Sequence, residues 1–311
     1  MGIGDILILT LLNVIWGTAF AASGYAMKFI SPVFLFAIRF LFTGLITVPI
    51  YRIAWDKISK KLVKNIFILA TLQTITFYGV ALSVKNLDSS TTAILTRLDI
   101  PFTIILASIT FKEKIKIQTI IGVFICFHGI YILSGAIQFT NIKYIFLMIF
   151  ASLTSGLANI IVKQLKDVDN RVVVAWNSVI MGIEMLIIAY FTENQFILLQ
   201  PLNMKFVLCL AYLCLLSNYI AYIILYYLLK KYDTTKLMPY NFFRPIISII
   251  SGYIILQEPI TYNKIIGTIM LLLGVFMTEH EYNKRSVISV MYRKAKIFVK
   301  RKRRVYYRIE Q

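Results

Sequence analysis

Charged residues are scarce in this chain, and acidic residues are the scarcest. Asp, Glu, Lys and Arg make up only 15% of the 311 residues, whereas hydrophobic residues make up 59%. A soluble domain carries about 25% charged residues, and a disordered chain needs low hydrophobicity. The composition therefore excludes both classes and indicates an integral membrane protein.

Cysteine and histidine are also rare. Cys126, Cys209 and Cys214 lie within apolar runs without a CxxC pair, and the two histidines are isolated. A metal site needs several such ligands at short spacing. We therefore expect no metal site, and we expect the cysteines to pack as small apolar side chains between helices.

Long apolar runs dominate the rest of the chain. A helix needs about 20 largely apolar residues to cross the hydrocarbon core. Runs of alternating polarity, the signature of a membrane β-barrel, are absent. The predicted transmembrane helices number ten, near 5–27, 33–51, 63–84, 90–111, 117–135, 142–162, 172–191, 206–229, 235–256 and 263–279.

The basic residues predict the orientation of these helices. Of the 33 Lys and Arg residues, 25 fall in segments on the side of the N-terminus and five on the opposite side. Because basic loops stay in the cytoplasm, we expect a multi-pass protein with both termini cytoplasmic. A composition rich in Lys, Ile and Tyr is typical of AT-rich bacterial genomes, which favours a bacterial inner membrane.

Residues 280–311 form a basic tail in which apolar and basic residues alternate at roughly helical spacing. This pattern favours a juxtamembrane helix that binds anionic lipid. A disordered topology anchor is the alternative. Nucleic-acid binding is not expected beside ten spans. The expected oligomeric state is a monomer or a homodimer.

The chain repeats itself after about 145 residues. Two acids, two glycines and a proline recur in the two halves: Asp88 with Asp233, Glu113 with Glu258, Gly122 with Gly267, Gly129 with Gly274, and, after a one-residue slip, Pro101 with Pro245. Because five spans is an odd number, the second half must cross the membrane upside down. The predicted fold is an all-α integral membrane protein of two inverted five-helix repeats, 1–136 and 137–279, followed by the tail 280–311. Such repeats are typical of secondary transporters.

These residues resemble the EamA family of the drug/metabolite transporter superfamily. The family pattern is matched by Trp16 and Gly17, Pro32 and Arg39, and Pro101, Glu113 and Gly122 in the first half, and by Pro245, Glu258 and Gly267 in the second. The Trp-Gly pair and the arginine have no obvious partner in the second half. The resemblance covers roughly residues 5–279. It implies a carrier of small metabolites, often an exporter of amino acids or related compounds, without a cofactor.

Other function classes remain as alternatives. A carrier of a nucleoside-bearing or other cofactor-like metabolite, by uptake or exchange, fits the same fold. A non-transporting subunit or a channel would lack alternating access. An enzyme acting on lipid-borne substrates would need an acid/base or metal cluster, and the sequence shows none, so we do not expect an enzyme.

Ionisable side chains within the spans are the first candidates for a binding site. Each costs at least about 2.5–3.5 kcal/mol in the membrane centre, so each needs a partner or a watery cavity. We expect Arg97, Asp99 and Arg244 to face a central cavity, where Arg97 or Arg244 binds a carboxylate or phosphate of the substrate. Structural ion pairs are the alternative, and for Arg39 and Glu184 a structural role is favoured.

Polar and aromatic side chains form the second set of candidates. Such groups suit a small, partly apolar metabolite, although they also bridge helices and occupy membrane interfaces. The predicted substrate-binding members are Trp16, Tyr78, Trp176, Asn177, Tyr219 and Asn241, and Gln73, Asn159, Asn218 and Tyr222 belong to a wider set. Pro101 and Pro245 interrupt backbone hydrogen bonds within spans, which predicts a gating bend or a fixed kink.

Overall fold

The computed structural model describes residues 3–50, 60–110, 117–135, 141–165, 168–194, 196, 203–222, 224, 228 and 243–277. The predicted all-α architecture is confirmed, and no β-strand occurs in these ranges. Asn241, Glu113 and the tail 280–311 lie outside them. The repeat boundaries, the lipid-binding tail and the oligomeric state therefore stay predictions.

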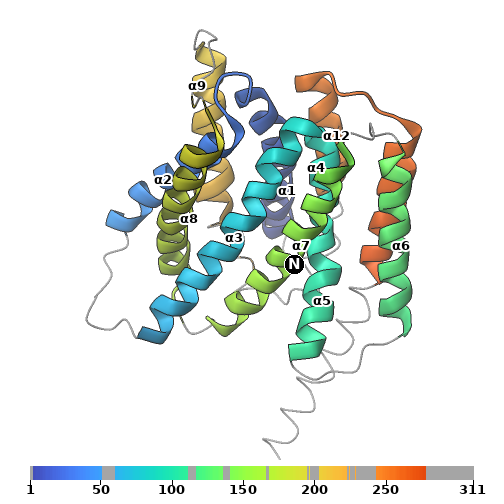
Figure 1. Ribbon diagram of the computed structural model, residues 1–311, viewed down its shortest axis with the longest axis horizontal. Coiled ribbons are helices and arrows are strands. Elements are labelled where there is room, and N and C mark those ends of the chain that lie inside the picture. Colours follow the sequence, from blue (N-terminus) through green and yellow to red (C-terminus); the bar gives the residue numbers. More distant parts are fainter. Residues whose placement is uncertain are drawn as a thin grey trace, which may run out of the picture.

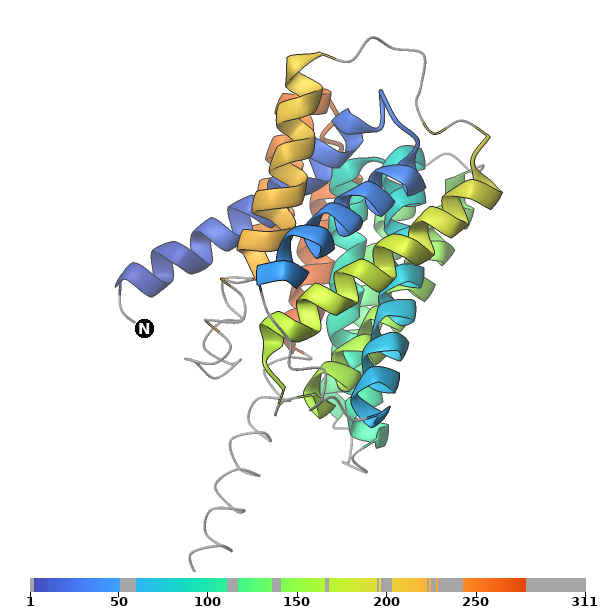
Figure 2. The ribbon, with the colours of Figure 1, turned by 90° about the vertical axis from the view of Figure 1, so that its left-hand side faces the viewer.

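The helices form one tilted bundle (Figures 1 and 2). Those of the first half are α1 (Ile3–Ala26), α2 (Pro32–Ile50), α3 (Lys60–Asn86), the continuous run of α4 (Ser89–Leu95), η2 (Thr96–Leu98) and α5 (Asp99–Thr110), and α6 (Ile117–Ser134). Those of the second half are α7 (Ile142–Gln164), α8 (Asn170–Thr192), α9 (Met204–Ala211) with the π-helical η4 (Tyr212–Ile220), α12 (Phe243–Ser251) with the π-helical η5 (Gly252–Leu256), and the helix Tyr262–Met277.

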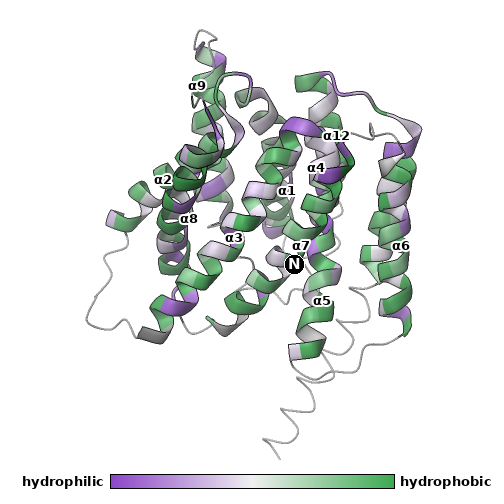
Figure 3. Ribbon diagram, viewed as in Figure 1, coloured by the Kyte–Doolittle hydropathy of each residue, from purple (hydrophilic) through white to green (hydrophobic). Residues whose placement is uncertain are grey.

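Apolar side chains cover the outside of the bundle as well as its interior. Within the described ranges, five helices are long and apolar enough to cross a membrane: α1, α2, α3, α7 and α8. Phe124, Tyr131 and Phe191 are each more than 70% exposed. Soluble proteins rarely expose so many large apolar groups, so this surface is suited to lipid. Figure 3 shows the apolar colouring along the length of the helices.

The contact between α6 and the helix Tyr262–Met277 reveals how the repeats are related. A Cβ on Gly129 would lie 2.9 Å from the oxygen of Gly267, and a Cβ on Gly274 would lie 2.5 Å from the oxygen of Gly122. The helices are antiparallel, and the 145-residue shift converts the first contact into the second. Such reciprocity requires a two-fold axis between the helices, which confirms the inverted repeat.

The helices α2 and α8 make the same kind of reciprocal contact, but their residues correspond at a different sequence shift. A Cβ on Gly44 would collide with Val179, and a Cβ on Gly182 would collide with Leu41. Gly44 and Leu41 map onto Gly182 and Val179 at a shift of 138 residues. The second half therefore contains seven more residues between its second helix and the later ones.

Local shifts identify the second-half positions that correspond to the Trp-Gly pair and the arginine. At 138 residues, Arg39 corresponds to Asn177. Gly17 lies close to Ile247 as Gly156 lies close to Phe102, so Gly17 corresponds to Gly156 and Trp16 to Ser155. Only the glycine keeps its residue type, so the tryptophan and the arginine have no matching residue in the second half.

The main hydrophobic core runs through both halves of the bundle. Phe36 of α2, Leu95 of α4, Met148 of α7 and Met181 of α8 are all nearly fully buried within one cluster. The two repeats therefore share a core, and neither forms a separate unit.

Replacing Gly129 by Ala tests the two-fold contact. The added methyl group would meet the Leu271 nitrogen at 2.8 Å, so the helices must separate. We expect a loss of about 1–3 kcal/mol in stability, the usual cost of overpacking. Thermal unfolding in detergent, followed by tryptophan fluorescence, measures the loss. Gly4→Ala is the control, since nothing lies within 4 Å of a Cβ there. Equal melting temperatures for the two variants would contradict the contact.

Candidate functional site

Trp16 of α1 contacts two other helices, α12 and the helix formed by η4 and the residues that follow it. The Arg244 guanidinium of α12 lies over its ring, 4.4 Å from the ring centroid. Tyr222 meets the ring edge-on at 5.7 Å. The Trp16 Nε1 donates a hydrogen bond to the Ser217 oxygen of η4 at 3.0 Å. The indole is thus fixed at its edge, and its face carries a cation–π contact.

Arg97 and Asp99 act on the same guanidinium electrostatically. Asp99 attracts Arg244 and Arg97 repels it. No ion pair joins the three side chains within the described ranges. Buried atoms of each, the Nε of Arg97, the Nε of Arg244 and Oδ1 of Asp99, have no hydrogen-bond partner among the described residues. Buried polar groups are normally paired, so these three atoms distinguish this cluster from the paired charges elsewhere in the bundle.

Local sequence explains why these side chains meet. Gly17 allows α12 to approach α1, since a Cβ there would lie 3.1 Å from the Arg244 oxygen. Pro101 has no N–H for the Arg97 carbonyl and would clash with it in a regular α-helix. The helix accordingly tightens into the 3-10 turn η2 just before α5, and this turn carries Arg97. Pro245 is buried in the first turn of α12.

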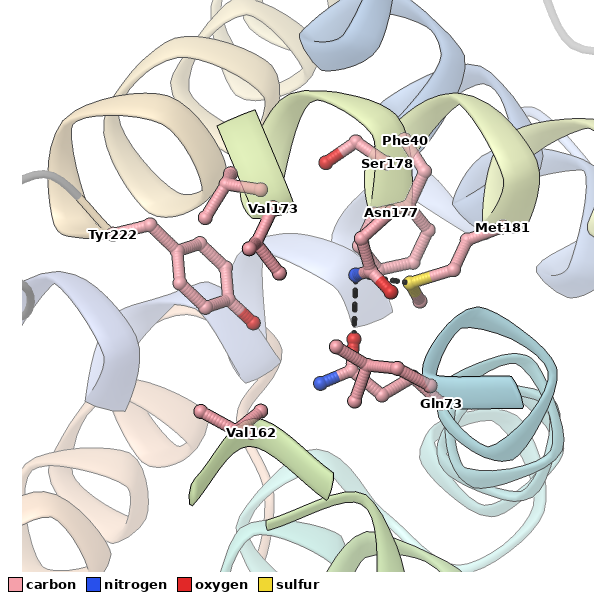
Figure 4. Close-up of a pocket in the computed structure, with 10 residues that line it drawn as sticks. Phe40, Gln73, Val162, Val173, Asn177, Ser178, Met181 and Tyr222 are labelled. Atoms are coloured by element: carbon pink, nitrogen blue, oxygen red, sulfur yellow. Dashed lines mark hydrogen bonds between the residues drawn. The ribbon is translucent and has the colours of Figure 1, made fainter. Parts of the chain in front are cut away.

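A small pocket with a free volume of about 20 Å³ lies beside this cluster (Figure 4). Tyr222 points its hydroxyl into the pocket, opposite Gln73 and Asn177. The Asn177 Nδ2 donates to Gln73 Oε1 at 2.6 Å, which joins α8 to α3. The lining residues are Phe40, Leu69, Gln73, Val162, Val173, Val174, Asn177, Ser178, Met181 and Tyr222.

The pocket lies toward one end of the bundle. Val162 is near the end of α7, and Val173 is near the start of α8. We call this the basic end, because it is the end predicted to be cytoplasmic. The opposite end, where α2 and α4 begin, is held by two glutamates and is called the clamped end; it is uppermost in Figure 1.

Glu258 closes the start of α4 at the clamped end. Its Oε1 accepts from the Ser89 N–H at 2.7 Å, and its Oε2 accepts from the Ser90 N–H at 3.1 Å. Lys264 forms an ion pair with Asp88 at 3.3 Å and donates to Ser90 Oγ. A carboxylate at a helix N-terminus satisfies unpaired N–H groups and the helix dipole. The second half thereby caps a helix of the first.

Glu193 closes the start of α2 in the same way. Its carboxylate accepts from the Val33 N–H at 2.8 Å, from the Phe34 N–H at 3.0 Å and from Ser31 Oγ. The Phe196 oxygen accepts from the Ser31 N–H, and the rings of Phe34 and Phe196 stack at 4.8 Å. The connection after α8 therefore holds the first turn of α2 in place.

Comparison with known proteins agrees with this architecture. The model of the EamA-like transporter family matches residues 2–135 and 142–279. The chain belongs to the EamA-like transporter family. The two matched segments correspond to the two five-helix repeats, and the protein is a multi-pass membrane transporter.

Several relatives of this EamA transporter extend over nearly its whole length. An uncharacterized transporter of Archaeoglobus fulgidus is 24% identical and covers 87% of this chain and 97% of its own. The uncharacterized transporter YoaV of Bacillus subtilis is 23% identical, covering 88% and 96%. A probable amino-acid metabolite efflux pump of Escherichia coli is 21% identical, covering 90% and 96%. A solved crystal structure, 12% identical, has a TM-score of 0.63 over 91% of this chain and 99% of that chain, which shows the shared fold.

The two ionisable residues expected to be structural have hydrogen-bond partners in this EamA transporter. Arg39 Nε donates to Asn218 Oδ1 at 2.8 Å, and its NH2 group donates to Ser217 Oγ at 2.8 Å. Glu184 accepts from the hydroxyls of Thr71 and Thr74 at 2.7 and 2.6 Å. Each interaction joins two helices.

The predicted site residues fall into three groups. Arg244 lies over Trp16, and Arg97 and Asp99 act on Arg244 electrostatically. Asn177 lines the adjacent pocket. The remaining described candidates do not line the pocket: Trp176 packs with the cluster that holds the pocket-lining Leu69 and Val173, Tyr78 packs against the main core, and Tyr219 lies half-buried on η4.

Several pocket residues escaped the sequence analysis. Phe40, Ser178 and Met181 line the pocket although no pattern in the sequence distinguishes them. Phe40 and Ser178 do share one property, since they correspond to each other at the 138-residue shift. A repeat alignment with the local shift would have found that pair.

Glu258→Ala tests the cap on α4. It leaves the Ser89 and Ser90 N–H groups unpaired, so we expect a loss of about 1.5–3 kcal/mol, typical of hydrogen bonds to a charged group. Unfolding in detergent measures the change. Asp169→Asn is the matched control, because it breaks an exposed ion pair with Arg171 while asparagine still caps a helix. A Glu258→Ala variant no less stable than the control would refute the cap.

Proposed function

We propose that this EamA transporter exports amino acids or related small zwitterionic metabolites across a bacterial inner membrane by alternating access, with both termini cytoplasmic. The observation that carries the proposal is the set of partnerless buried atoms on Arg97, Asp99 and Arg244. Two guanidinium groups and one carboxylate match the carboxylate and ammonium groups of an amino acid. The substrate would supply the hydrogen bonds that the cluster lacks.

The electrostatics of the cluster favour such a substrate. Arg97 repels Arg244, and Asp99 offsets only part of the excess positive charge. A substrate carboxylate between the arginines reduces this repulsion, because opposite charges interact strongly away from water. The Trp16 and Tyr222 rings provide an apolar wall for the rest of the molecule.

The names of relatives favour an amino acid over a nucleoside-bearing metabolite. Relatives named probable amino-acid metabolite efflux pumps occur in Escherichia coli and Salmonella typhimurium, both 21% identical. These names support the amino-acid class without identifying its member.

Counterflow in proteoliposomes tests the proposal. The twenty proteinogenic amino acids are first screened by thermal shift, and the hits are then tested as radiolabelled tracers against the unlabelled compound inside. We expect at least one tracer to accumulate transiently. Arg244→Gln should slow counterflow at least about tenfold, the effect of losing a charged hydrogen bond worth about 1.5–3 kcal/mol.

Arg171→Gln serves as the control for charge removal, since Arg171 is exposed and pairs only with the neighbouring Asp169 among the contacts described. Its counterflow rate should match that of the wild-type protein. Absence of counterflow with every amino acid would refute the substrate class. Equal rates for Arg244→Gln and Arg171→Gln would remove Arg244 from the site.

A further inference from the structure

The pocket at the basic end has a buried counterpart in the other half of the repeat. The Asn177–Gln73 hydrogen bond corresponds to the Arg39–Asn218 hydrogen bond, because Asn177 maps onto Arg39 at 138 residues and Gln73 onto Asn218 at 145. Both bonds link the second helix of one repeat to the third helix of the other. The two-fold axis therefore relates the two polar pairs.

Other pocket residues follow the same relation. Val162 maps onto Ser23 at the 139-residue shift that pairs Gly156 with Gly17. Leu69 maps onto Cys214 at 145 residues, and Val174 onto Phe36 at 138. We call Ser23, Phe36, Arg39, Cys214, Ser217 and Asn218 the counterpart cluster. Because the axis lies between the inverted halves, this cluster lies toward the clamped end.

The two regions differ in exposure although their positions correspond. Gln73, Val162 and Asn177 are partly exposed in the pocket. Their counterparts Asn218, Ser23 and Arg39 are buried, with exposed fractions of 2%, 1% and 7%. In an inverted repeat, such a difference is what one open side and one closed side produce.

The charge of Arg39 is a second, independent observation. Its guanidinium contacts two neutral oxygens and the rings of Phe36 and Phe40. No carboxylate lies within ion-pair distance of it in the described part of the chain. A buried cation without a counter-ion is costly unless another state supplies water or an anion.

We propose that the counterpart cluster is a second substrate-access site, which opens at the clamped end when the pocket at the basic end closes, and in which Arg39 binds the substrate's carboxylate. This rests on the proposed function, because only an alternating-access carrier exchanges the two states. The two sites and the central cluster adjoin one another: the pocket-lining Tyr222 interacts electrostatically with both Arg39 and Arg244, and Ser217 accepts hydrogen bonds from both Arg39 and Trp16.

Glu193 holds this second site closed. Its three hydrogen bonds fix the first turn of α2, and Phe36 and Arg39 follow one and two turns later on the same helix. Release of these bonds would free the start of α2 to move away from α1 and α9. The glutamate is therefore the latch of the clamped end.

Cysteine accessibility tests the proposal without any substrate. Ser23→Cys and Val162→Cys are made separately in a chain carrying C126A, C209A and C214A, and whole cells and inverted vesicles are treated with a membrane-impermeant methanethiosulfonate. We expect Val162→Cys to react from the basic end and Ser23→Cys from the opposite side. Adding Glu193→Ala should increase the rate of the Ser23→Cys reaction by about five- to thirtyfold and decrease the rate of the Val162→Cys reaction. This range is the change in population that the loss of one helix cap produces.

The native Cys214, kept alone in a C126A/C209A chain, repeats the test with no new residue in the cluster. Reaction of Cys214 from the clamped end supports the proposal. No reaction of Ser23→Cys or Cys214 from either side, with or without Glu193→Ala, overturns it. If the thiols react as expected while no amino acid is transported, the second site stands and the proposed substrate class fails.

Discussion

Each half of this transporter supplies the polar partners that the other half lacks. Lipid offers no hydrogen bonds, so every buried N–H, carbonyl and charge must be satisfied within the protein. Glu258 and Glu193 of the second half cap α4 and α2 of the first. Asn218 pairs with Arg39, and Asn177 pairs with Gln73, in both cases across the halves. The bundle therefore forms as one unit, and its polar network lies where the two halves are in contact.

Close helix contacts restrict the two halves to discrete relative arrangements. Gly129 and Gly274 bring backbones into contact at the two-fold axis, and Gly44 and Gly182 do the same between α2 and α8. Packed interfaces of this kind do not deform continuously. The α6 contact is nearly symmetric and suits a fixed pivot. The polar pairs differ between the halves, with Arg39 and Asn218 on one side and Asn177 and Gln73 on the other, so the asymmetry is concentrated in the access pathways.

The sequence predicted the spans and the repeat because both depend on strong signals, long apolar runs and matched acid, proline and glycine residues. It did not predict the correspondence of Arg39 with Asn177, because seven additional residues in the second half change the shift. In the site, Arg97, Asp99 and Arg244 were identifiable because charges in lipid are costly. Phe40 and Met181 belong to the main core and also line the pocket, and Trp176 packs beside the pocket-lining Leu69 and Val173. Residue type alone therefore does not separate core from pocket residues in the sequence.

Alternating access requires two states whose free energies differ by only a few kcal/mol. The latch formed by Glu193 stabilises one closed end, while the uncompensated charge of Arg39 makes that closure costly. The partnerless atoms of Arg97, Asp99 and Arg244 raise the energy of the empty centre in the same arrangement. A substrate that forms hydrogen bonds with Arg97, Asp99 and Arg244 removes the cost of their unpaired atoms. A substrate carboxylate that then reaches Arg39 removes the cost of its uncompensated charge. The unsatisfied groups of the empty protein are thus the groups through which substrate binding can shift the equilibrium between the states.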